Sequence, residues 1–118
     1  MYQYRAEVVY VVDGDTIDVA VDLGFKHTQE MRLRLAGIDT WELRGEERAK
    51  GLVAKEYVLE TFANMDPEDY VVIRTKKDKQ GKYGRYIATV LIMGRDDTEL
   101  LNLNDALVEE GHARRVPW

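Results

Sequence analysis

The stretch VVDGDTIDV, residues 11–19, contains the pattern that decides the fold. Before its Asp-Gly-Asp centre, residues 4–12 carry apolar side chains on both alternating faces. After it, residues 16–22 alternate between apolar and polar side chains. Both patterns are typical of β-strands. An Asp-Gly pair between two such runs predicts a tight hairpin at residues 13–15, because glycine accepts a positive φ without steric cost.

Further elements are predicted on the C-terminal side of this hairpin. In chain order they are a longer turn at 23–30, a strand at 31–35, a loop at 37–45, a helix at 46–64 that Pro67 cannot extend, strands at 70–75 and 85–93, and a short helix capped by Asn102 and ended by Gly111. The longer helix is rich in helix-forming residues, with an apolar stripe expected at Leu52, Leu59, Phe62 and Ala63.

Three strands, a helix, two strands and a last helix follow one another in this prediction. The pattern alone supports a small α+β barrel or sheet. The order is that of a five-stranded OB-fold, a Greek-key β-barrel with a helix between strands 3 and 4, followed here by a short C-terminal helix. A length of 118 residues predicts a single domain, residues 1–118.

The charge of the chain is distributed unevenly. The net charge of -5 by itself argues against nucleic-acid binding. Residues 74–95, however, contain one acid, Asp78, and seven basic residues, so this segment carries 7 - 1 = +6 and the remainder -11. The basic residues are Arg74, Lys76, Lys77, Lys79, Lys82, Arg85 and Arg95. The segment is either a solvated hairpin or a phosphate-binding surface.

Several protein classes are excluded or left open by composition. The chain has no cysteine, which excludes disulfides and thiolate metal sites. It has no apolar run of the length of a membrane span, so no membrane association is expected. Residues 1–7 lack the pattern of a signal peptide, which leaves a cytoplasmic protein or a processed secreted form.

Acidic side chains gather after the first and third predicted strands. Asp13 and Asp15 flank a glycine, and such a carboxylate pair either binds a hard cation or simply forms the turn. Asp39, Thr40 and Glu42 follow the third strand directly. Their acids could supply a metal ligand and a general base, or they could complement the positive end of the helix that follows.

Basic side chains form two further groups. Arg32 and Arg34 are two residues apart on one strand and share a face, which suits either phosphate binding or cross-strand pairing with Asp18 or Asp22. The turn with Lys82, Tyr83, Gly84 and Arg85 leads into the fifth strand and could equally be an ordinary surface hairpin.

These groups together resemble a known family, although none is specific alone. The resemblance is carried by VVDGDTIDV, LRLAGIDTWE at 33–42, KYGRYIATV at 82–90 and LNDALVEEGHA at 103–113. In order and spacing they closely resemble the staphylococcal nuclease-like (thermonuclease) family over residues 8–113. The resemblance implies a calcium-dependent nuclease that acts as a monomer on DNA and RNA and prefers single strands.

The resemblance also implies a role for each residue of the candidate site. It assigns Ca²⁺ binding to Asp15, Asp39 and Thr40, with Asp13 as a further acid near the metal. It assigns the scissile phosphate to Arg34 and Arg85, a neighbouring phosphate to Lys82 and Tyr83, and activation of the attacking water to Glu42. The catalytic set is therefore expected to be Arg34, Glu42 and Arg85.

The sequence departs from the family pattern in ways that bear on activity. Trp41 stands where the family often has proline, and it either alters the presentation of Glu42 or stacks on a base. The loop after Glu42 is shorter, and the chain is acidic where the family prototype is basic. The alternative function is a catalytically inactive OB-fold module that binds nucleic acid or protein.

Overall fold

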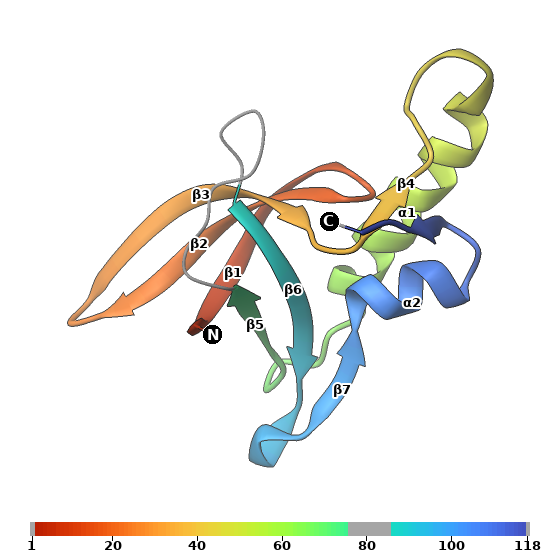
Figure 1. The fold of residues 1–118 in the computed structure, drawn as a ribbon. Coiled ribbons are helices and arrows are strands. Elements are labelled where there is room, and N and C mark those ends of the chain that lie inside the picture. Colours follow the sequence, from red (N-terminus) through yellow and green to blue (C-terminus); the bar gives the residue numbers. More distant parts are fainter. Residues whose placement is uncertain (1, 76–85, 118) are drawn as a thin grey trace.

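The computed structural model describes residues 2–75 and 86–117, and Figure 1 shows their arrangement. The strands are β1 (Tyr2–Asp13), β2 (Thr16–Gly24), β3 (His27–Leu35), β4 (Ile38–Thr40), β5 (Tyr70–Thr75), β6 (Tyr86–Met93), β7 (Glu99–Asn102) and β8 (Ala113–Arg115). The helices are α1 (Arg48–Ala63) and α2 (Leu103–Glu109), with single 3-10 turns at Gly45–Glu47 and Arg95–Asp97.

Five of the described strands close a barrel. β1 pairs antiparallel with β2 and with β5, β2 pairs with β3, and β5 pairs with β6. The parallel pairing of β3 with β6 closes the ring, and β7 extends the sheet from β6. With α1 between β4 and β5 and α2 near the C-terminus, this is the predicted α+β OB-fold barrel.

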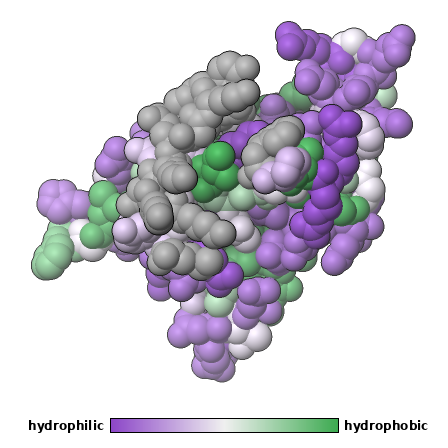
Figure 2. Space-filling view, in the orientation of Figure 1, coloured by the Kyte–Doolittle hydropathy of each residue, from purple (hydrophilic) through white to green (hydrophobic). Residues whose placement is uncertain are grey.

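The core lies inside the barrel and beneath the two helices. Alternate residues of each strand point inward, so the side chains of Ile17, Val19 and Val21 on β2 are at most 1% exposed. Val58 of α1 and Leu107 of α2 are fully buried against the barrel and cover it. The visible face of the molecule is covered mainly by hydrophilic side chains, with apolar colours in scattered small areas (Figure 2).

The structure corrects the predicted turn at 23–30. β2 and β3 continue through most of that range, and Phe25 and Lys26 alone make the turn, with φ of 53° and 64°. Two successive positive φ values fit a type I′ hairpin, which usually contains asparagine or glycine. The position of this tight turn could not be predicted, because phenylalanine and lysine seldom adopt a positive φ.

The structure also corrects the loop predicted at 37–45, because this range contains β4. The three residues of β4 pair with β8, which lies more than 70 positions later, and so short a strand gives no local signal. The predicted stripe on α1 is correct only at Phe62, which packs against the core. Gly51, Ala54 and Val58 form the buried face of the helix, while Leu52 and Leu59 are 45% and 41% exposed.

The ends of both helices follow the predicted signals. Asn64 ends α1, and its amide reaches back to the carbonyl of Glu60. The side chain of Asn102 accepts a hydrogen bond from the amide of Asp105 at the start of α2, and Gly111 follows that helix with a φ of 78°. Neither described helix is long and apolar enough to cross a bilayer.

Candidate active site

The turn between β1 and β2 packs closely against two other elements. A Cβ atom on Gly14 would lie 3.0 Å from Thr40 Cγ2 and 3.1 Å from Ala54 Cβ. Gly14 does not have a positive φ, so the stated reason for glycine in this hairpin was wrong. Its absent side chain matters instead, because it lets the Asp13–Asp15 turn approach β4 and α1.

Arg34 contacts one acid from each of the two predicted acidic groups, Asp15 from the first and Asp39 from the second. Its Nη1 lies 3.0 Å from Asp15 Oδ2, and its Nη2 lies 3.3 Å from Asp39 Oδ1. The pairing of β2 with β3 sets Thr16 opposite Arg34, and the amide of Leu35 donates to the Asp15 carbonyl at 2.8 Å. The Arg34 side chain is 11% exposed, so this guanidinium is largely enclosed by the acids it contacts.

β4 brings Asp39 and Thr40 to the same place. The amide of Thr40 donates to Asp15 Oδ2 at 3.1 Å. The pairing of β4 with β8 sets Asp39 opposite Arg114, whose Nη2 lies 3.2 Å from Asp39 Oδ2. Asp39 is therefore held between two arginines, one from the barrel wall and one from β8.

The carboxyl groups of Asp13 and Asp15 in the β1–β2 turn interact directly with each other. Burial and the adjacent Asp15 carboxyl raise the pKa of Asp13 to about 6. Burial opposes ionisation of Asp15 too, but its hydrogen bond with Asp13 and the charge of Arg34 outweigh it and lower the pKa of Asp15. Asp15 is therefore the first of the two to ionise as the pH rises.

Glu42 lies apart from the Arg34 cluster in its contacts. Its side chain is 61% exposed, and Oε2 lies 3.4 Å from Arg44 Nε. Its backbone is fixed, because its amide donates to Glu47 Oε1 at 3.0 Å and a Cβ on Gly51 would lie 2.2 Å from its carbonyl oxygen. α1 thus packs directly on the backbone that carries Glu42.

Trp41 connects this segment to the turn before β8. Its Nε1 donates to the carbonyl of Gly111 at 3.2 Å, and the ammonium of Lys50 lies 4.9 Å from its ring centroid. The half-buried ring therefore has a fixed position between α1 and the α2–β8 turn.

Arg32 forms a cross-strand ion pair with Asp18, which was one of the two roles predicted for it. Its Nε lies 2.8 Å from Asp18 Oδ1 across β2 and β3, and a second bond joins Nη2 to Asp18 Oδ2. This hydrogen bonding lowers the pKa of Asp18. Although Arg32 and Arg34 share a strand, only Arg34 contacts the candidate site.

The remaining predicted residues, Lys82, Tyr83 and Arg85, lie outside the described residues, as do Lys76, Lys77 and Lys79.

Two residues that shape the candidate site were not predicted from the sequence. Arg114 belongs to a strand recognisable only through its pairing with β4, although two arginines after Gly111 were a visible signal. Gly51 was also visible, since an isolated glycine in a helix costs about 1 kcal/mol and often marks close packing.

The donors present suit a hard cation by their chemistry. Asp15 and Asp39 offer carboxylate oxygens next to Thr40, and such oxygens are the ligands that calcium prefers. After burial, the Asp15 carboxyl is the next cause of the raised pKa of Asp13, and a cation at this turn would offset that repulsion. Residues 2–75 and 86–117 contain no group of three acidic or histidine side chains placed to hold a metal ion, and Arg34 contacts both Asp15 and Asp39.

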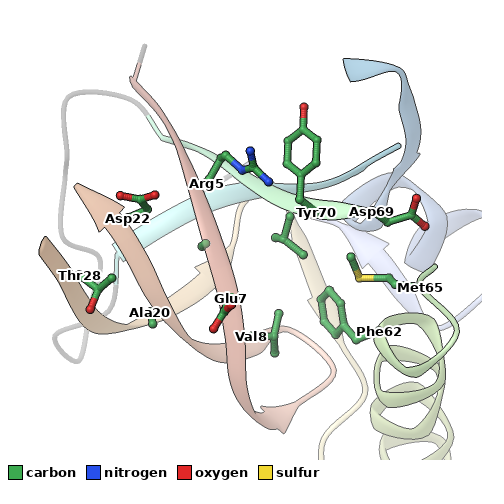
Figure 3. A pocket seen from close by; sticks show the side chains of 12 residues that line it. Arg5, Glu7, Val8, Ala20, Asp22, Thr28, Phe62, Met65, Asp69 and Tyr70 are labelled. Carbon is green, nitrogen blue, oxygen red and sulfur yellow. The ribbon is translucent and has the colours of Figure 1, made fainter. Parts of the chain in front are cut away.

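A cavity of about 620 Å³ lies away from these residues. Figure 3 shows its walls, which include Arg5 and Glu7 on β1, Asp22 on β2, and Phe62 near the end of α1. None of the described predicted site residues lines it. Arg5 is already engaged there, with its guanidinium 3.9 Å from the centroid of the Tyr70 ring.

The fold and the cluster of Asp15, Arg34 and Asp39 define the chain as an OB-fold protein with a compact site of acids and arginine. The model of the staphylococcal nuclease homologue family matches residues 32–117. Because this match covers most of the chain, the protein belongs to that family.

Three relatives illustrate the similarity. The chain is 34% identical to protein ParB of Escherichia coli, over 94% of the chain and 56% of that protein. It is 33% identical to micrococcal nuclease of Shigella flexneri, over 93% and 57%, and 30% identical to an uncharacterized protein of Methanocaldococcus jannaschii, over 94% and 58%. The chain spans a little over half the length of these relatives.

Proposed function

We propose that the protein is a calcium-dependent nuclease that hydrolyses phosphodiester bonds in DNA and RNA, with a preference for single strands, and that it acts as a monomer. The observation that carries the proposal is Arg34, whose two terminal nitrogens contact Asp15 and Asp39 at 3.0 and 3.3 Å. This pairing joins a guanidinium suited to phosphate with carboxylates suited to a hard cation.

Asp15, Asp39 and Thr40 would hold the ion. When bound, calcium supplies positive charge that meets the charge developing on the nonbridging phosphate oxygens. Asp15 suits this role because its pKa is lowered and it is ionised at neutral pH. The fixed β4–β8 pairing keeps Asp39 and Thr40 beside it.

Arg34 would bind the scissile phosphate. Its guanidinium presents planar paired donors, and its low exposure strengthens each interaction because little water competes. Arg85 is proposed as the second clamp on the same phosphate. Lys82 and Tyr83 would contact the neighbouring phosphate, which sets the strand in register.

Glu42 would accept the proton of the attacking water. The water oxygen forms a bond to phosphorus and its proton passes to the Glu42 carboxylate. The bond from phosphorus to the 5′-oxygen breaks, and that oxygen takes a proton from solvent and leaves as a 5′-hydroxyl, so that a 3′-phosphate end remains. The exposed carboxylate of Glu42 and the fixed backbone beneath it support this assignment. The micrococcal nuclease of Shigella flexneri, similar over 93% of the chain, supports the reaction class.

The second candidate is an OB-fold binding module without catalysis. The observation that favours it is the placement of Glu42, whose carboxylate contacts Arg44 and not Arg34 in the described part of the chain. Under this function the Asp15–Arg34–Asp39 contacts would be structural ion pairs.

Incubation with single-stranded DNA and with RNA, in calcium and in chelator, separates the two. The nuclease predicts cleavage that requires calcium and yields 3′-phosphate ends. The binding module predicts a shifted but intact oligonucleotide in both buffers. An Asp18→Asn variant is the matched control, because Asp18 pairs with Arg32 away from the site and its loss should leave cleavage unchanged.

A further inference from the structure

A groove of about 350 Å³ is lined in part by Trp41, the neighbour in sequence of Thr40 and Glu42, and has no role in the reaction described above. Its walls come from three segments: Trp41 after β4, the first half of α1, and the turn before β8. The lining residues are Trp41, Ala49, Lys50, Val53, Glu110, Gly111 and His112. In Figure 1 these three segments lie together at the end of β4.

Two residues that line the groove are close in sequence to residues of the candidate site. Trp41 stands between Thr40, a proposed metal ligand, and Glu42, the proposed base. At its other side, His112 directly precedes β8, whose Arg114 contacts Asp39. The two segments that carry Trp41 and His112 therefore contribute both to the groove and to the candidate site.

The side chain of Trp41 lines the groove and is oriented by a hydrogen bond. Its Nε1–H bond to the Gly111 carbonyl at 3.2 Å fixes one edge of the indole, and its half-buried ring faces the groove. A ring fixed in advance loses little entropy when it stacks on a flat partner. Aromatic side chains of this kind bind bases of either sugar type, because every base presents a π-face.

Lys50 gives the groove a second feature of a nucleotide site. Its ammonium lies 4.9 Å from the Trp41 ring centroid, and its long side chain is exposed. Lysine has four rotatable bonds, so it can leave the ring when a base arrives and pair with the adjoining phosphate. The groove volume is sufficient for a base, since a cavity of about 150 Å³ already holds a benzene ring.

We propose that this groove is a base-stacking subsite for a nucleotide that flanks the cleaved bond, with Trp41 as the stacking surface and Lys50 as the phosphate contact. The proposal rests on the proposed function, since the nucleotide arrives as part of the bound strand. Stacking on a single tryptophan does not select one base, so the subsite adds affinity and register for unpaired strands. Bases within a duplex are stacked on their neighbours and cannot enter it.

The test uses tryptophan fluorescence in chelator, so that cleavage does not interfere. The chain has two tryptophans, and a Trp118→Phe background leaves Trp41 as the reporter. The probes are a short oligothymidylate and an abasic oligonucleotide of the same length and charge, titrated at low salt. Binding is followed independently by the anisotropy of a dye on each oligonucleotide.

The subsite predicts quenching of Trp41 by oligothymidylate and little quenching by the abasic strand. Trp41→Leu should weaken oligothymidylate binding by roughly tenfold to a hundredfold, the usual range for loss of one stacking aromatic, and the abasic strand by much less. Lys50→Met should weaken both strands alike. Phe25→Leu is the matched control, because this aromatic side chain is 96% exposed at the distant β2–β3 turn and should change neither.

Three outcomes overturn the proposal. Binding by anisotropy without quenching of Trp41 removes the subsite and leaves the nuclease intact. Equal quenching by both strands shows a purely electrostatic effect and also removes stacking. Failure of both strands to bind in chelator removes the subsite as proposed, and the cleavage assay in calcium then decides the nuclease function separately. Melts of Trp41→Leu and of the parent confirm that a folded variant is compared.

Discussion

Arg34 Nη1 lies 3.0 Å from Asp15 Oδ2, and both side chains are only 11% exposed. Its guanidinium contacts Asp15 of the β1–β2 turn and Asp39 of β4. The same residue therefore serves the proposed chemistry and the balance of charge within the site.

Replacing Arg34 should affect both activity and stability. Arg34→Ala should lower cleavage by at least about a hundredfold, the usual scale for loss of one preorganised charge donor. It should also destabilise the protein by roughly 3 kcal/mol, because Asp15 and Asp39 lose the charge that compensates them. Arg32→Ala is the matched control and should change stability little, since Arg32 is half exposed and its ion pair with Asp18 lies at the protein surface. Thermal melts in chelator and single-turnover rates measure the two effects; an Arg34→Ala protein as stable as the parent would contradict the enclosed geometry.

The Arg85→Ala variant tests the clamp that lies outside the described residues. If Arg85 shares the scissile phosphate with Arg34, its loss should lower cleavage by at least about a hundredfold. Raising monovalent salt should weaken substrate binding in the parent, because phosphate contacts release counterions, and this salt dependence should be shallower in the variant. Activity retained in Arg85→Ala would remove this arginine from the site.

Calcium should stabilise the folded protein through Asp15 and Asp39. At a hundredfold excess over Kd the expected gain is about 2.7 kcal/mol, measured as a rise in Tm over the chelator value. Asp15→Asn and Asp39→Asn should lose most of this rise together with calcium-dependent cleavage. Asp18→Asn should keep it, because Asp18 contacts Arg32 and lies outside the acid group. Equal calcium shifts in all four proteins would show that the ion binds elsewhere.

A methyl group at Gly51 should disturb Glu42 through its backbone. The Cβ of Gly51→Ala would lie 2.2 Å from the Glu42 carbonyl oxygen and 2.9 Å from that of Trp41, so either α1 or this segment must move. Alanine favours helices by up to about 1 kcal/mol over glycine, and a net loss of stability would show that the clash outweighs this gain. We expect a lower Tm and a lower kcat. Glu56→Ala, an exposed change on the same helix, should alter neither.

Asn104 should be a determinant of stability rather than of chemistry. Its buried side chain accepts from the amide of Val90 at 3.0 Å and donates to the carbonyls of Ala36 and Ala88 at 2.9 and 3.2 Å. Asn104→Ala should destabilise by roughly 2–4 kcal/mol, because buried backbone groups lose their partners. Asn102→Ala removes only the cap of α2 and should cost about 1 kcal/mol. Denaturant unfolding compares the two, and a smaller effect at Asn104 would contradict its bridging role.

Much of the fold could be predicted because its signals are local. The alternation in residues 16–22, the capping by Asn102 and the stop at Gly111 each depend on neighbours in sequence, and the structure confirms them. The stripe on α1 was mispredicted because Leu52 and Leu59 are apolar yet exposed, while the buried face uses the small Gly51 and Ala54. Close packing of helix on turn is a property of two surfaces, and hydrophobicity along one helix does not record it.

The sequence by itself determined the barrel order, the family and the identities of the acids and arginines offered for the site. Only the tertiary structure decided which of them meet. Arg32 and Arg34 are equivalent in pattern, but the β2–β3 register gives Arg32 to Asp18, while the β4–β8 pairing brings Asp39 to Arg34 and adds Arg114. The physical reason is that an ion pair forms between atoms about 3 Å apart, and such distances are set by pairings between strands remote in the chain, which residue type and spacing do not fix.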